Sequence, residues 1–381
     1  MSFTTPKLTL MVGRMVAAPA PASLMSALRR AQVTNTDSGP SGFQLEFQVT
    51  RGSSPLDYSV MTQGLLAPFN RIVLMVTLST LPTVIMDGLI TRIELHPRQG
   101  NQPDMMVVTG EDISVAMDLM EKTMPFPAMS DWMIADLIMA EYAAYGIIPM
   151  ALPTAVSLSM MPLDYTIQQG GMTDRAFLNK LARRNGYVFQ IIPGPAPMTN
   201  TGYFGPPRRL GVPQAALTIN ELPLSNVNAL SFSYDALAPT TVTGLVQDTL
   251  ETDMDIPIEA LLPVRVPPLA AMPAILANVP NIRVTLLDPE GMDPMQAEVV
   301  AQSMVDRSTD NVMTASGELD VLRYGSVLSA PGLVGVRGAG YGHDGLYYVQ
   351  QVTHDIKPES YTQQFTLTRE GWGSTVPGVL P

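Results

Sequence analysis

Hydrophobic and polar positions alternate most regularly near the C-terminus, between Val334 and Gly371. Residues 346–354 are rich in β-branched and aromatic side chains. Residues 361–369 place Tyr, Gln, Phe and Leu at one set of alternate positions and Thr and Gln at the other. A period of two that is bounded by Gly, Pro and Asp indicates an antiparallel hairpin with one buried face. The polar residues 355–360 are expected to form the loop between its two strands.

A glycine-rich run precedes this hairpin and contains the string G-x-G-x-x-G at Gly340, Gly342 and Gly345. A dinucleotide-binding fingerprint opens a helix inside a βαβ unit. Here an alternating strand follows the glycines instead of a helix. We therefore predict a structural turn at Gly340, Gly342 and Gly345, with a positive φ at Gly345. No cofactor is expected.

Period-two patterns continue through residues 1–115, which we expect to form a first β domain, and through residues 216–372, which we expect to form a second one. In the first domain a helical turn is expected at residues 22–30 and an Asp87-Gly88 turn after a break at Pro82. The second domain is expected to contain one helix, at residues 294–306. The strands predicted for the first domain are 7–15, 43–49, 71–77, 83–86, 89–96 and 105–109.

The pattern changes to a helical period in residues 116–215, which predicts an α+β middle domain. One helix begins after Ser130, and a second is capped by Thr173 or Asp174 and ends at Asn185-Gly186. Arg183 and Arg184 lie in the last turn of the second helix, where positive charge suits the helix dipole.

Residues 373–381 form a C-terminal tail that is apolar and rich in glycine. Such a tail has no obvious core within the chain to join, so it is expected to dock on a partner. The residues expected to take part are Trp372, Val376, Val379 and Leu380.

An internal similarity connects the two β domains. Residues 87–96 resemble residues 344–354, because each segment begins with Asp-Gly, continues as a strand that ends at His, and precedes a polar loop that contains proline. Internal repeats reveal architecture. The expected fold class is α+β, mainly β, with two related antiparallel β-barrel domains and a helix-containing domain inserted between them.

Composition favours a protein that works through partners. Charged residues make up 15% of the chain, against roughly 25% in an average soluble domain, and the chain has 34 Pro and 26 Met. A surface with few charges and many methionines suits extensive contacts with other proteins. The net charge of −12 argues against nucleic-acid binding through phosphate neutralisation. The absence of cysteine excludes disulfides, thiolate metal sites and a cysteine nucleophile, which fits assembly in a reducing cytoplasm and also a particle that is released later.

The candidates for chemistry are few. The histidines His96, His343 and His354 lack zinc-site spacing, and the acidic cluster Asp248, Glu251, Asp253 and Asp255 lacks the pattern of a calcium loop. We therefore predict no catalytic residue and no metal site. Two alternatives to a purely structural role stay open. One is a β-rich hydrolase with a site at His354-Asp355, and the other is a carbohydrate-binding protein of the tail-fibre type.

Neither a secretory leader nor a membrane span is expected. Residues 142–163 carry no charge, but Gly146, Pro149, Pro153 and Pro162 interrupt them. The apolar run near the N-terminus is short and is followed by Arg14.

Four segments carry a family resemblance. The helix at residue 294, the strand 345–354 and the strand 361–369 together resemble the end of phage late control protein D. These are the T4-type baseplate hub proteins of contractile tails and contractile injection systems, and the N-terminal part of VgrG is similar to them. Residues 173–189 are similar to the helix-then-strand segment of the family's middle domain. The resemblance covers most of the chain in order.

The resemblance implies two tube-like barrels per chain and a homotrimer that presents six barrels as a ring. Such a hub is a symmetry adaptor between a six-fold inner tube and a three-fold central spike. It implies a structural role without catalysis, assembly in the bacterial cytoplasm, and a place in a virion tail or an injection-particle baseplate. The implied partners are the inner tube protein, the spike, and baseplate wedge, tape-measure or LysM-type proteins. In VgrG the hub continues into an oligonucleotide-fold domain and a β-helical needle. Because this sequence ends at Pro381, we expect a separate spike and no cell-wall lysozyme activity.

Overall fold

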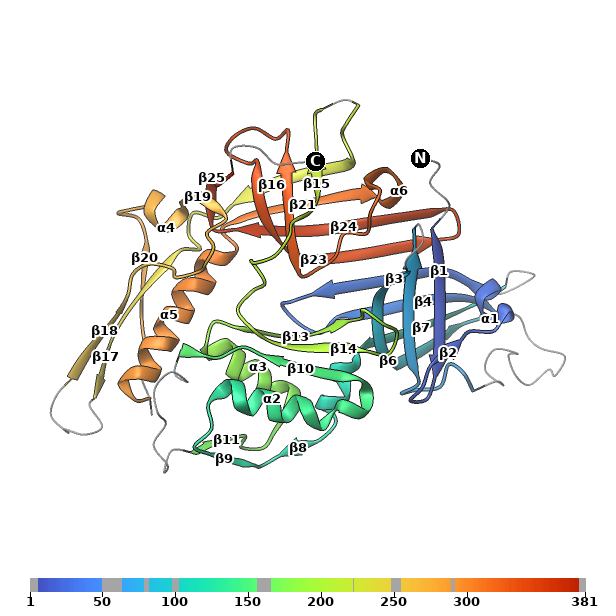
Figure 1. Cartoon of the computed structure of the whole chain (residues 1–381), viewed down its shortest axis with the longest axis horizontal. Helices are drawn as coiled ribbons and strands as arrows, with labels where there is room; N and C mark the ends of the chain where they lie inside the picture. The colour runs from blue at the N-terminus through green and yellow to red at the C-terminus, as the bar shows by residue number, and fades with distance from the viewer. Residues whose placement is uncertain are drawn as a thin grey trace.

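A computed structural model describes residues 6–49, 64–78, 82–97, 103–155, 166–221, 223–247, 255–288 and 292–376. The molecule is mainly β, as predicted, and one large sheet runs through its upper and right-hand parts (Figure 1). The middle domain lies below this sheet. A long helix, α5, and a small sheet form a separate lobe on the left (Figure 1).

The first β module has six main strands, which are β1 (Lys7–Gly13), β3 (Leu28–Thr36), β4 (Gly42–Val49), β5 (Arg71–Thr77), β6 (Pro82–His96) and β7 (Asp104–Asp112). Their order in the sheet is β3-β4-β7-β6-β5-β1, and all neighbours are antiparallel. The short strand β2 (Ala18–Pro19) pairs with β1, and the helix α1 (Ala22–Ala27) precedes β3.

The second β module repeats this plan with β15 (Gln214–Thr218), β16 (Val227–Tyr234), β21 (Met313–Asp320), β22 (Gly332–Arg337), β23 (Gly345–Lys357) and β24 (Ser360–Arg369). Its spatial order is β16-β21-β24-β23-β22-β15. Strands in the same chain position therefore take the same sheet position in both modules, which confirms the predicted repeat. One difference is that β15 is parallel to β22, whereas β1 is antiparallel to β5.

The repeat extends to the pairing registers. The pairing of β6 with β7 shifts between Ile90 and Arg92, and that of β23 with β24 shifts at the equivalent place, between Val349 and Gln351. The pairs β3–β4 and β16–β21 also share one shift. Such bulges are defined features of a sheet and fix its register. They align the two modules residue by residue, so that the equivalent pairs include Ile93 and Val352, Leu95 and His354, Val33 and Phe232, and Asn35 and Tyr234.

Two turns expected from the sequence lie inside strands. Asp87 and Gly88 are in the middle of β6, a single strand of 15 residues, so the predicted turn is wrong. The predicted break at Pro82 is confirmed, because β5 ends at Thr77 and β6 begins at Pro82. Residues 355–357 likewise continue β23, because they pair across the sheet with β24 and in part with β3. The predicted loop therefore shrinks to the two residues 358 and 359. Strand β3 was also missed, since its first residues fall within the predicted helical turn 22–30.

The middle domain follows β7. Its helices are η1 (Ile113–Asp118), α2 (Asp131–Glu141), η2 (Ala143–Tyr145) and α3 (Asp174–Arg184). Its strands are β8 (Glu121–Lys122), β9 (Pro125–Pro127), β10 (Ile147–Ala151), β11 (Thr166–Gln168), β12 (Met172–Thr173), β13 (Val188–Pro193) and β14 (Asn200–Gly205). Thr173 caps α3 by accepting a hydrogen bond from the Ala176 N–H. The predicted beginning of this helix is therefore confirmed.

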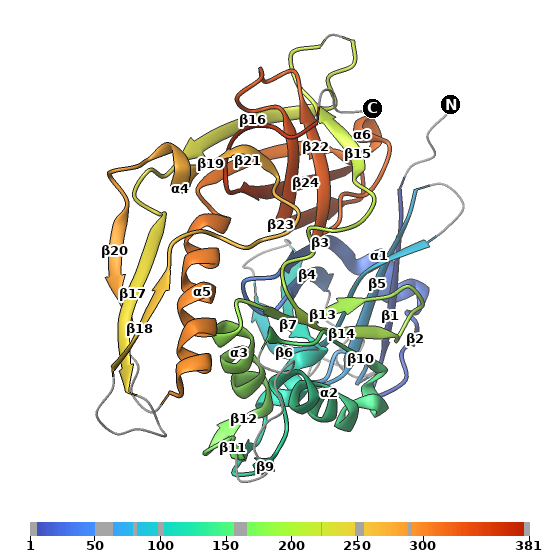
Figure 2. The ribbon, with the colours of Figure 1, turned by 60° about the vertical axis from the view of Figure 1, so that its left-hand side comes forward.

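An insertion separates β16 from β21, and Figure 2 shows its helix α5 lying along its sheet. Its elements are β17 (Thr240–Gln247), β18 (Asp255–Ala260), β19 (Ala270–Pro273), α4 (Ala274–Ala277), β20 (Arg283–Leu286) and α5 (Pro294–Asp310). The helix predicted at residues 294–306 is thus confirmed. The remaining elements are α6 (Val321–Tyr324) and β25 (Gly371–Ser374). Within the described residues, no helix has the length and apolar character needed to cross a membrane.

The two β modules share one apolar core. A single cluster of buried side chains runs from Leu10 and Leu45 in the first module to Val334 and Leu367 in the second. The middle domain and the insertion have separate clusters. The two modules are therefore held together by burial of common apolar surface.

Candidate functional site

Strand β23 joins the two modules. Its first half pairs with β22, and its second half pairs antiparallel with β3 of the first module. Thr353 lies opposite Thr34, with 3.0 Å between their hydroxyl oxygens. Asp355 accepts a hydrogen bond from Arg30 at 2.7 Å. A strand of one module thereby extends the sheet of the other.

The equivalents of these two strands have open edges. Strand β16 pairs with β21 alone among the described strands, and residues 91–96 of β6 pair with β7 alone among them. The core-facing side chains Ile93, Leu95, Phe232 and Tyr234 are only half-buried, whereas their counterparts at the joined edge are buried. Free N–H and C=O groups on an edge strand are ready to pair with another strand. The chain therefore exposes two open strand edges, on β6 and β16. These strands are equivalent to β23 and β3, which pair with each other inside the chain.

The face of this sheet opposite the core is polar. Hydroxyl and amide side chains alternate with buried residues along its strands, and they include Gln32, Thr34, Gln44, Ser231, Ser316, Gln351, Thr353, Gln364 and Thr366. Several charges on this face are paired: Arg30 with Glu46 and Asp355, Arg92 with Glu94, and Lys357 with Asp355. The face therefore presents hydrogen-bonding groups with locally balanced charge.

The glycine turn is held from inside by Arg369. Gly340 and Gly345 have φ values of 90° and 124°, whereas Gly342 does not lie in the positive-φ region. The fully buried Arg369 guanidinium donates to the carbonyls of Gly342, Asp344 and Gly371 at 2.8, 2.9 and 3.0 Å. It also lies 4.4 Å from the centre of the Tyr347 ring. Sequence reasoning missed Arg369, although its position continues the buried alternation of Phe365 and Leu367 in β24.

Trp372 packs within the chain. The residues around it form β25, which pairs with β19 so that Trp372 lies opposite Met272. Its ring stacks on Tyr234 at 4.7 Å and meets His343 edge-on at 5.3 Å. The expectation that this segment lacks a core to join is therefore wrong at Trp372. Val376 is half-buried near Ser374, and Val379 and Leu380 lie outside the described residues.

His354 is a structural residue of the core. It is 1% exposed, and its Nδ1 accepts from the Tyr361 hydroxyl at 2.7 Å and from Gln363 Nε2 at 3.2 Å. Its Nε2–H donates to Asn35 Oδ1 at 3.1 Å, since the Asn35 amide nitrogen is committed to the Ile85 carbonyl. The carboxylate of the adjacent Asp355 accepts a hydrogen bond from Arg30 instead. None of these contacts supplies the nucleophile or the carboxylate that the hydrolase alternative requires.

The burial of His354 predicts a pH effect on stability. Burial lowers the pKa of His354 to about 3. In mildly acidic solution the imidazole is therefore protonated in the unfolded state and neutral in the folded state. The contribution of His354 to stability is fully present above the unfolded pKa of about 6.5, and it is lost progressively as the pH drops below that value. Between pH 7 and pH 5 we expect a loss of about 2 kcal/mol from this residue. Urea titrations of the wild type and of His354→Gln at both pH values measure it.

The His354→Gln variant keeps the other titrating groups, so its own pH dependence is the reference. Burial raises the pKa of Asp37 to about 6, which works in the opposite direction in both proteins and cancels. Equal pH slopes for the two proteins would contradict the assignment of His354 as a buried neutral imidazole.

A buried ion pair connects the first module to the middle domain. Arg71 and Asp87 are joined by two hydrogen bonds of 2.7 and 2.6 Å, and their side chains are 3% and 0% exposed. Asn200 donates to Asp87 at 2.9 Å. Arg71 also donates to the Tyr145 and Met198 carbonyls. Sequence reasoning missed this pair because Asp87 read as a turn residue.

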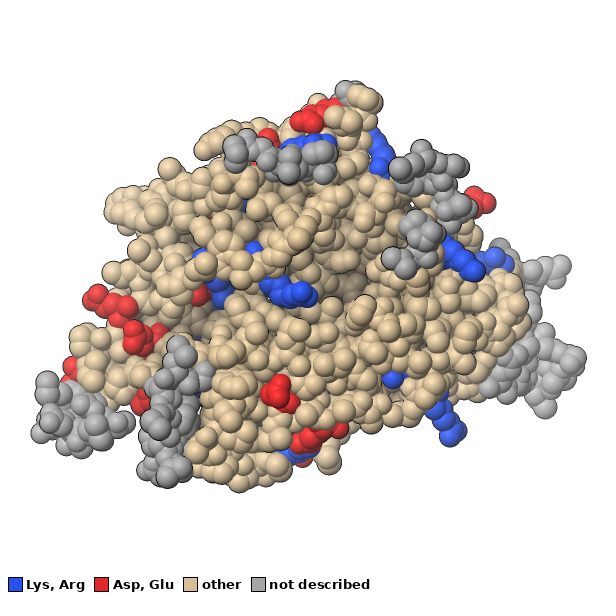
Figure 3. All heavy atoms as spheres, in the orientation of Figure 1, with Lys and Arg blue, Asp and Glu red and all other residues tan. Residues whose placement is uncertain are grey.

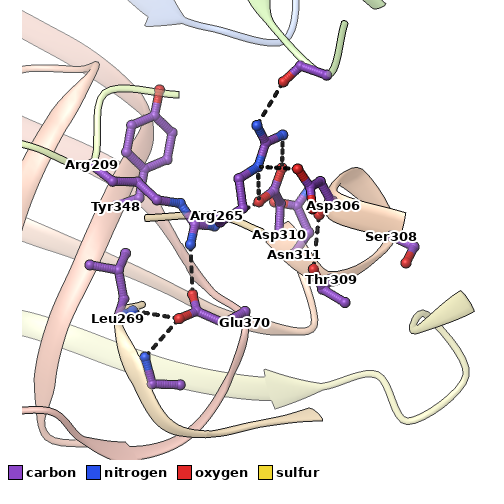
Figure 4. Close-up of polar contacts among 12 residues, drawn as sticks. Arg209, Arg265, Leu269, Asp306, Ser308, Thr309, Asp310, Asn311, Tyr348 and Glu370 are labelled. Atoms are coloured by element: carbon purple, nitrogen blue, oxygen red, sulfur yellow. Dashed lines mark hydrogen bonds and ion pairs between the residues drawn. The ribbon is translucent and has the colours of Figure 1, made fainter. Parts of the chain in front are cut away.

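A second ionic network connects the middle domain, the insertion and the second module (Figure 4). Arg209 donates to Glu370 at 2.9 Å and to Asp310 at 2.6 Å. Arg265 donates to Asp310 at 2.8 Å and to the Gly186 carbonyl at 2.8 Å. Charges buried in this way depend on complete pairing. The network therefore fixes the middle domain and the insertion against the second module.

Within the described parts of the chain, no group of three or more His, Asp or Glu side chains is placed to hold a metal ion. Of the acidic cluster singled out in the sequence, Asp248, Glu251 and Asp253 lie outside the described residues. Asp255 begins β18.

No protein-family model matches the sequence, and no curated protein matches it significantly. Solved structures with the same fold exist. A tail protein from Neisseria meningitidis MC58 aligns with a TM-score of 0.65 at 12% identity, covering 96% of this chain and 97% of that one. The 43 kDa tail protein of prophage MuSo2 from Shewanella oneidensis aligns with a TM-score of 0.64 at 13% identity, covering 95% and 98%.

A third structure comes from a secretion machine. It is an E. coli component of the type VI secretion system, described as structurally similar to the T4 bacteriophage tail proteins gp27 and gp5. It aligns with a TM-score of 0.53 at 14% identity, covering 93% of this chain and 77% of that one. The chain therefore has the fold of phage tail and baseplate-type proteins. The resemblance identified from the sequence is confirmed at the level of the fold.

Proposed function

We propose that this protein is the baseplate hub of a phage tail or contractile injection system, a homotrimer that adapts a six-fold inner tube to a three-fold central spike. The observation that carries the proposal is the duplication of the β module, which extends to its bulges and registers. Three chains with two equivalent modules each place six similar modules around one axis, while the assembly keeps three-fold symmetry. The fold of tail and baseplate-type proteins supports this setting.

The pairing of β23 with β3 inside the chain serves as the template for the proposed pairing between subunits. Repeating the β23–β3 pairing brings β6 of one subunit against β16 of the next subunit. Each chain contributes the eight strands from β16 to β6, and eight strands in each of three chains make a closed ring of 24. Closure removes every free edge of that ring. The polar face of the sheet would then line the central passage.

The module alignment also predicts the register of the joint. Thr353 and Thr34 are opposite each other within the chain, and their equivalents are Glu94 and Ser233. The same alignment places Leu95 of one subunit opposite Phe232 of the next. It therefore covers the half-buried apolar side chains of both open edges, which is favourable by roughly 25 cal/mol for each Å² removed from water.

Cysteine cross-linking tests the trimer and its register together, because the chain contains no cysteine of its own. The variant with Glu94→Cys and Ser233→Cys should form disulfides between subunits upon oxidation, since opposed strand residues lie within disulfide reach. Non-reducing electrophoresis should show dimers and trimers that disappear with reductant. Light scattering of the unmodified protein should give the mass of three chains.

Two matched variants serve as controls. Thr34→Cys with Thr353→Cys reproduces the joint within one chain, so its oxidised form should remain a monomer on the denaturing gel. Glu94→Cys with Phe232→Cys places the two cysteines on opposite faces and should not cross-link. A protein that stays monomeric beside its tube and spike, or that cross-links equally in both interchain variants, contradicts the proposal.

The hub role implies axial partners on both sides of the ring. The proposed partners are the inner tube protein above, a three-fold spike below, and wedge, tape-measure or LysM-type proteins around them. Assembly would take place in the bacterial cytoplasm and end in the tail or particle baseplate. The role is structural and requires no catalytic residue.

A further inference from the structure

A basic cleft lies between the middle domain and the insertion, where α3 and α5 approach each other. It encloses about 1120 Å³ and is lined by residues of both helices, by the turn at Asp37 and by Tyr348 on β23. Figure 3 shows basic side chains gathered around the hollow between the two lobes of the molecule. The cleft shares none of its lining with the open edges of β6 and β16, so it is a separate surface.

Six basic residues line the cleft, and they differ in whether they have a partner: Lys180, Arg183, Arg184, Arg209, Arg265 and Arg307. Arg184 pairs with Asp131, while Arg209 and Arg265 belong to the network around Asp310. Lys180, Arg183 and Arg307 are exposed, and within the described part of the chain none of their side chains has an ion pair or hydrogen bond. Three of the six basic side chains therefore have no ion-pair partner among the described residues.

Two of these unpaired side chains, Arg183 and Arg307, come from the two helices that line the cleft. Partial enclosure in the cleft lowers the pKa of Arg307, the positive charges of Arg183 and Arg265 lower it as well, and the Asp310 carboxylate offsets part of this effect. Arg183 projects from α3 and Arg307 from α5, so these two guanidiniums repel each other across the cleft. The acidic residues of the lining are Asp37 and Asp310, and Asp310 already has two arginine partners. In a chain with a net charge of −12, this is a local site of positive potential that draws in negative groups.

We propose that this cleft binds an acidic peptide segment of a partner protein, with Arg183 and Arg307 as the main contacts and Lys180 as a third. A carboxylate between two guanidiniums accepts hydrogen bonds from both, and arginine binds carboxylates in a two-pronged geometry. The volume exceeds the roughly 300–1,000 Å³ of a typical small-molecule pocket. The size therefore suits several residues of an extended chain.

The arrangement of the helices favours carboxylates over phosphate. Compact phosphate sites use the N–H groups at the N-terminus of a helix. Here the three unpaired basic residues of the cleft lie in the second halves of α3 and α5, and α3 ends at Arg184. Recognition therefore falls to side chains spaced along two helices, which matches separate carboxylates along a peptide.

Binding of a fluorescein-labelled octaglutamate peptide, followed by fluorescence anisotropy at about 50 mM salt, tests the inference with the full chain. The double variant Arg183→Gln with Arg307→Gln should weaken binding by about tenfold or more. Both side chains are exposed and without a partner among the described residues, and their charges repel each other, so the thermal unfolding midpoint should not fall. Raising the salt concentration should weaken binding to the wild type more than to the variant.

The matched control removes two exposed arginines elsewhere, with Arg14→Gln and Arg283→Gln, at the same cost in net charge. It should change the affinity by less than about twofold. No binding of the peptide, or an equal loss in both double variants, overturns the inference. Tighter binding of an eight-nucleotide single strand of DNA through the same two arginines would overturn it as well, in favour of a nucleic-acid site. The inference stands apart from the trimer, because the cleft is complete within one chain.

Discussion

Replacing Asp87 with alanine is expected to lower the free energy of unfolding by about 3–5 kcal/mol. The substitution leaves the Arg71 guanidinium charged in a place where its side chain is only 3% exposed. It removes two hydrogen bonds from Arg71 and the acceptor of Asn200. Urea denaturation followed by circular dichroism measures the loss.

Asp355→Ala is the matched control, because Asp355 also accepts two hydrogen bonds from an arginine, Arg30. The side chains of that pair are 33% and 23% exposed, so water replaces the lost partner. The expected loss is below about 1 kcal/mol. If both substitutions cost the same, burial of the Arg71–Asp87 pair does not decide its contribution. A loss that is confined to the middle domain would show that the pair serves the domain junction alone.

Gly345→Val is expected to cost about 3 kcal/mol or more, the second-largest effect. At φ 124° the backbone of Gly345 is strained for any residue with a β-carbon. A β-carbon would also lie 3.1 Å from Ser374 Cα and 3.1 Å from Arg369 Nη1. The branched side chain would therefore disturb the buried guanidinium that holds the turn. The thermal unfolding midpoint should fall by several degrees.

Two further glycine substitutions separate backbone strain from crowding. Gly340 has a φ of 90° but open space around it, so Gly340→Ala should cost only about 1 kcal/mol. Gly39 has open space and no positive φ, so Gly39→Val should be nearly neutral. A cost for Gly345→Val no greater than that for Gly340→Ala would show that the contacts with Ser374 and Arg369 yield without penalty.

The sequence alone was sufficient for most of the elements and for the repeat. The alternation at residues 43–49 and 361–367 reports directly which side chains are buried, and helical spacing does the same for α3. The Asp-Gly similarity identified β6 and β23 as equivalent strands. It misplaced their alignment, however, because the shared bulges set Asp87 level with Leu346, two residues beyond Asp344.

Only the tertiary structure decided which residues meet. Strand β3 pairs with residues more than 300 positions away in β23, and β25 finds its partner β19 in the insertion. Arg175, Arg183 and Arg184 look alike in the sequence. Arg175 meets Glu111 and Asp118, and Arg184 meets Asp131, whereas Arg183 lines the same cleft as Arg307.

The physical reason for this division lies in the range of the forces. The period of a strand or helix follows from which face of one element leaves water, so neighbouring residues record it. Strand partners, charge compensation and the open edges at β6 and β16 depend on where distant elements come to lie. For those features the folded chain is needed.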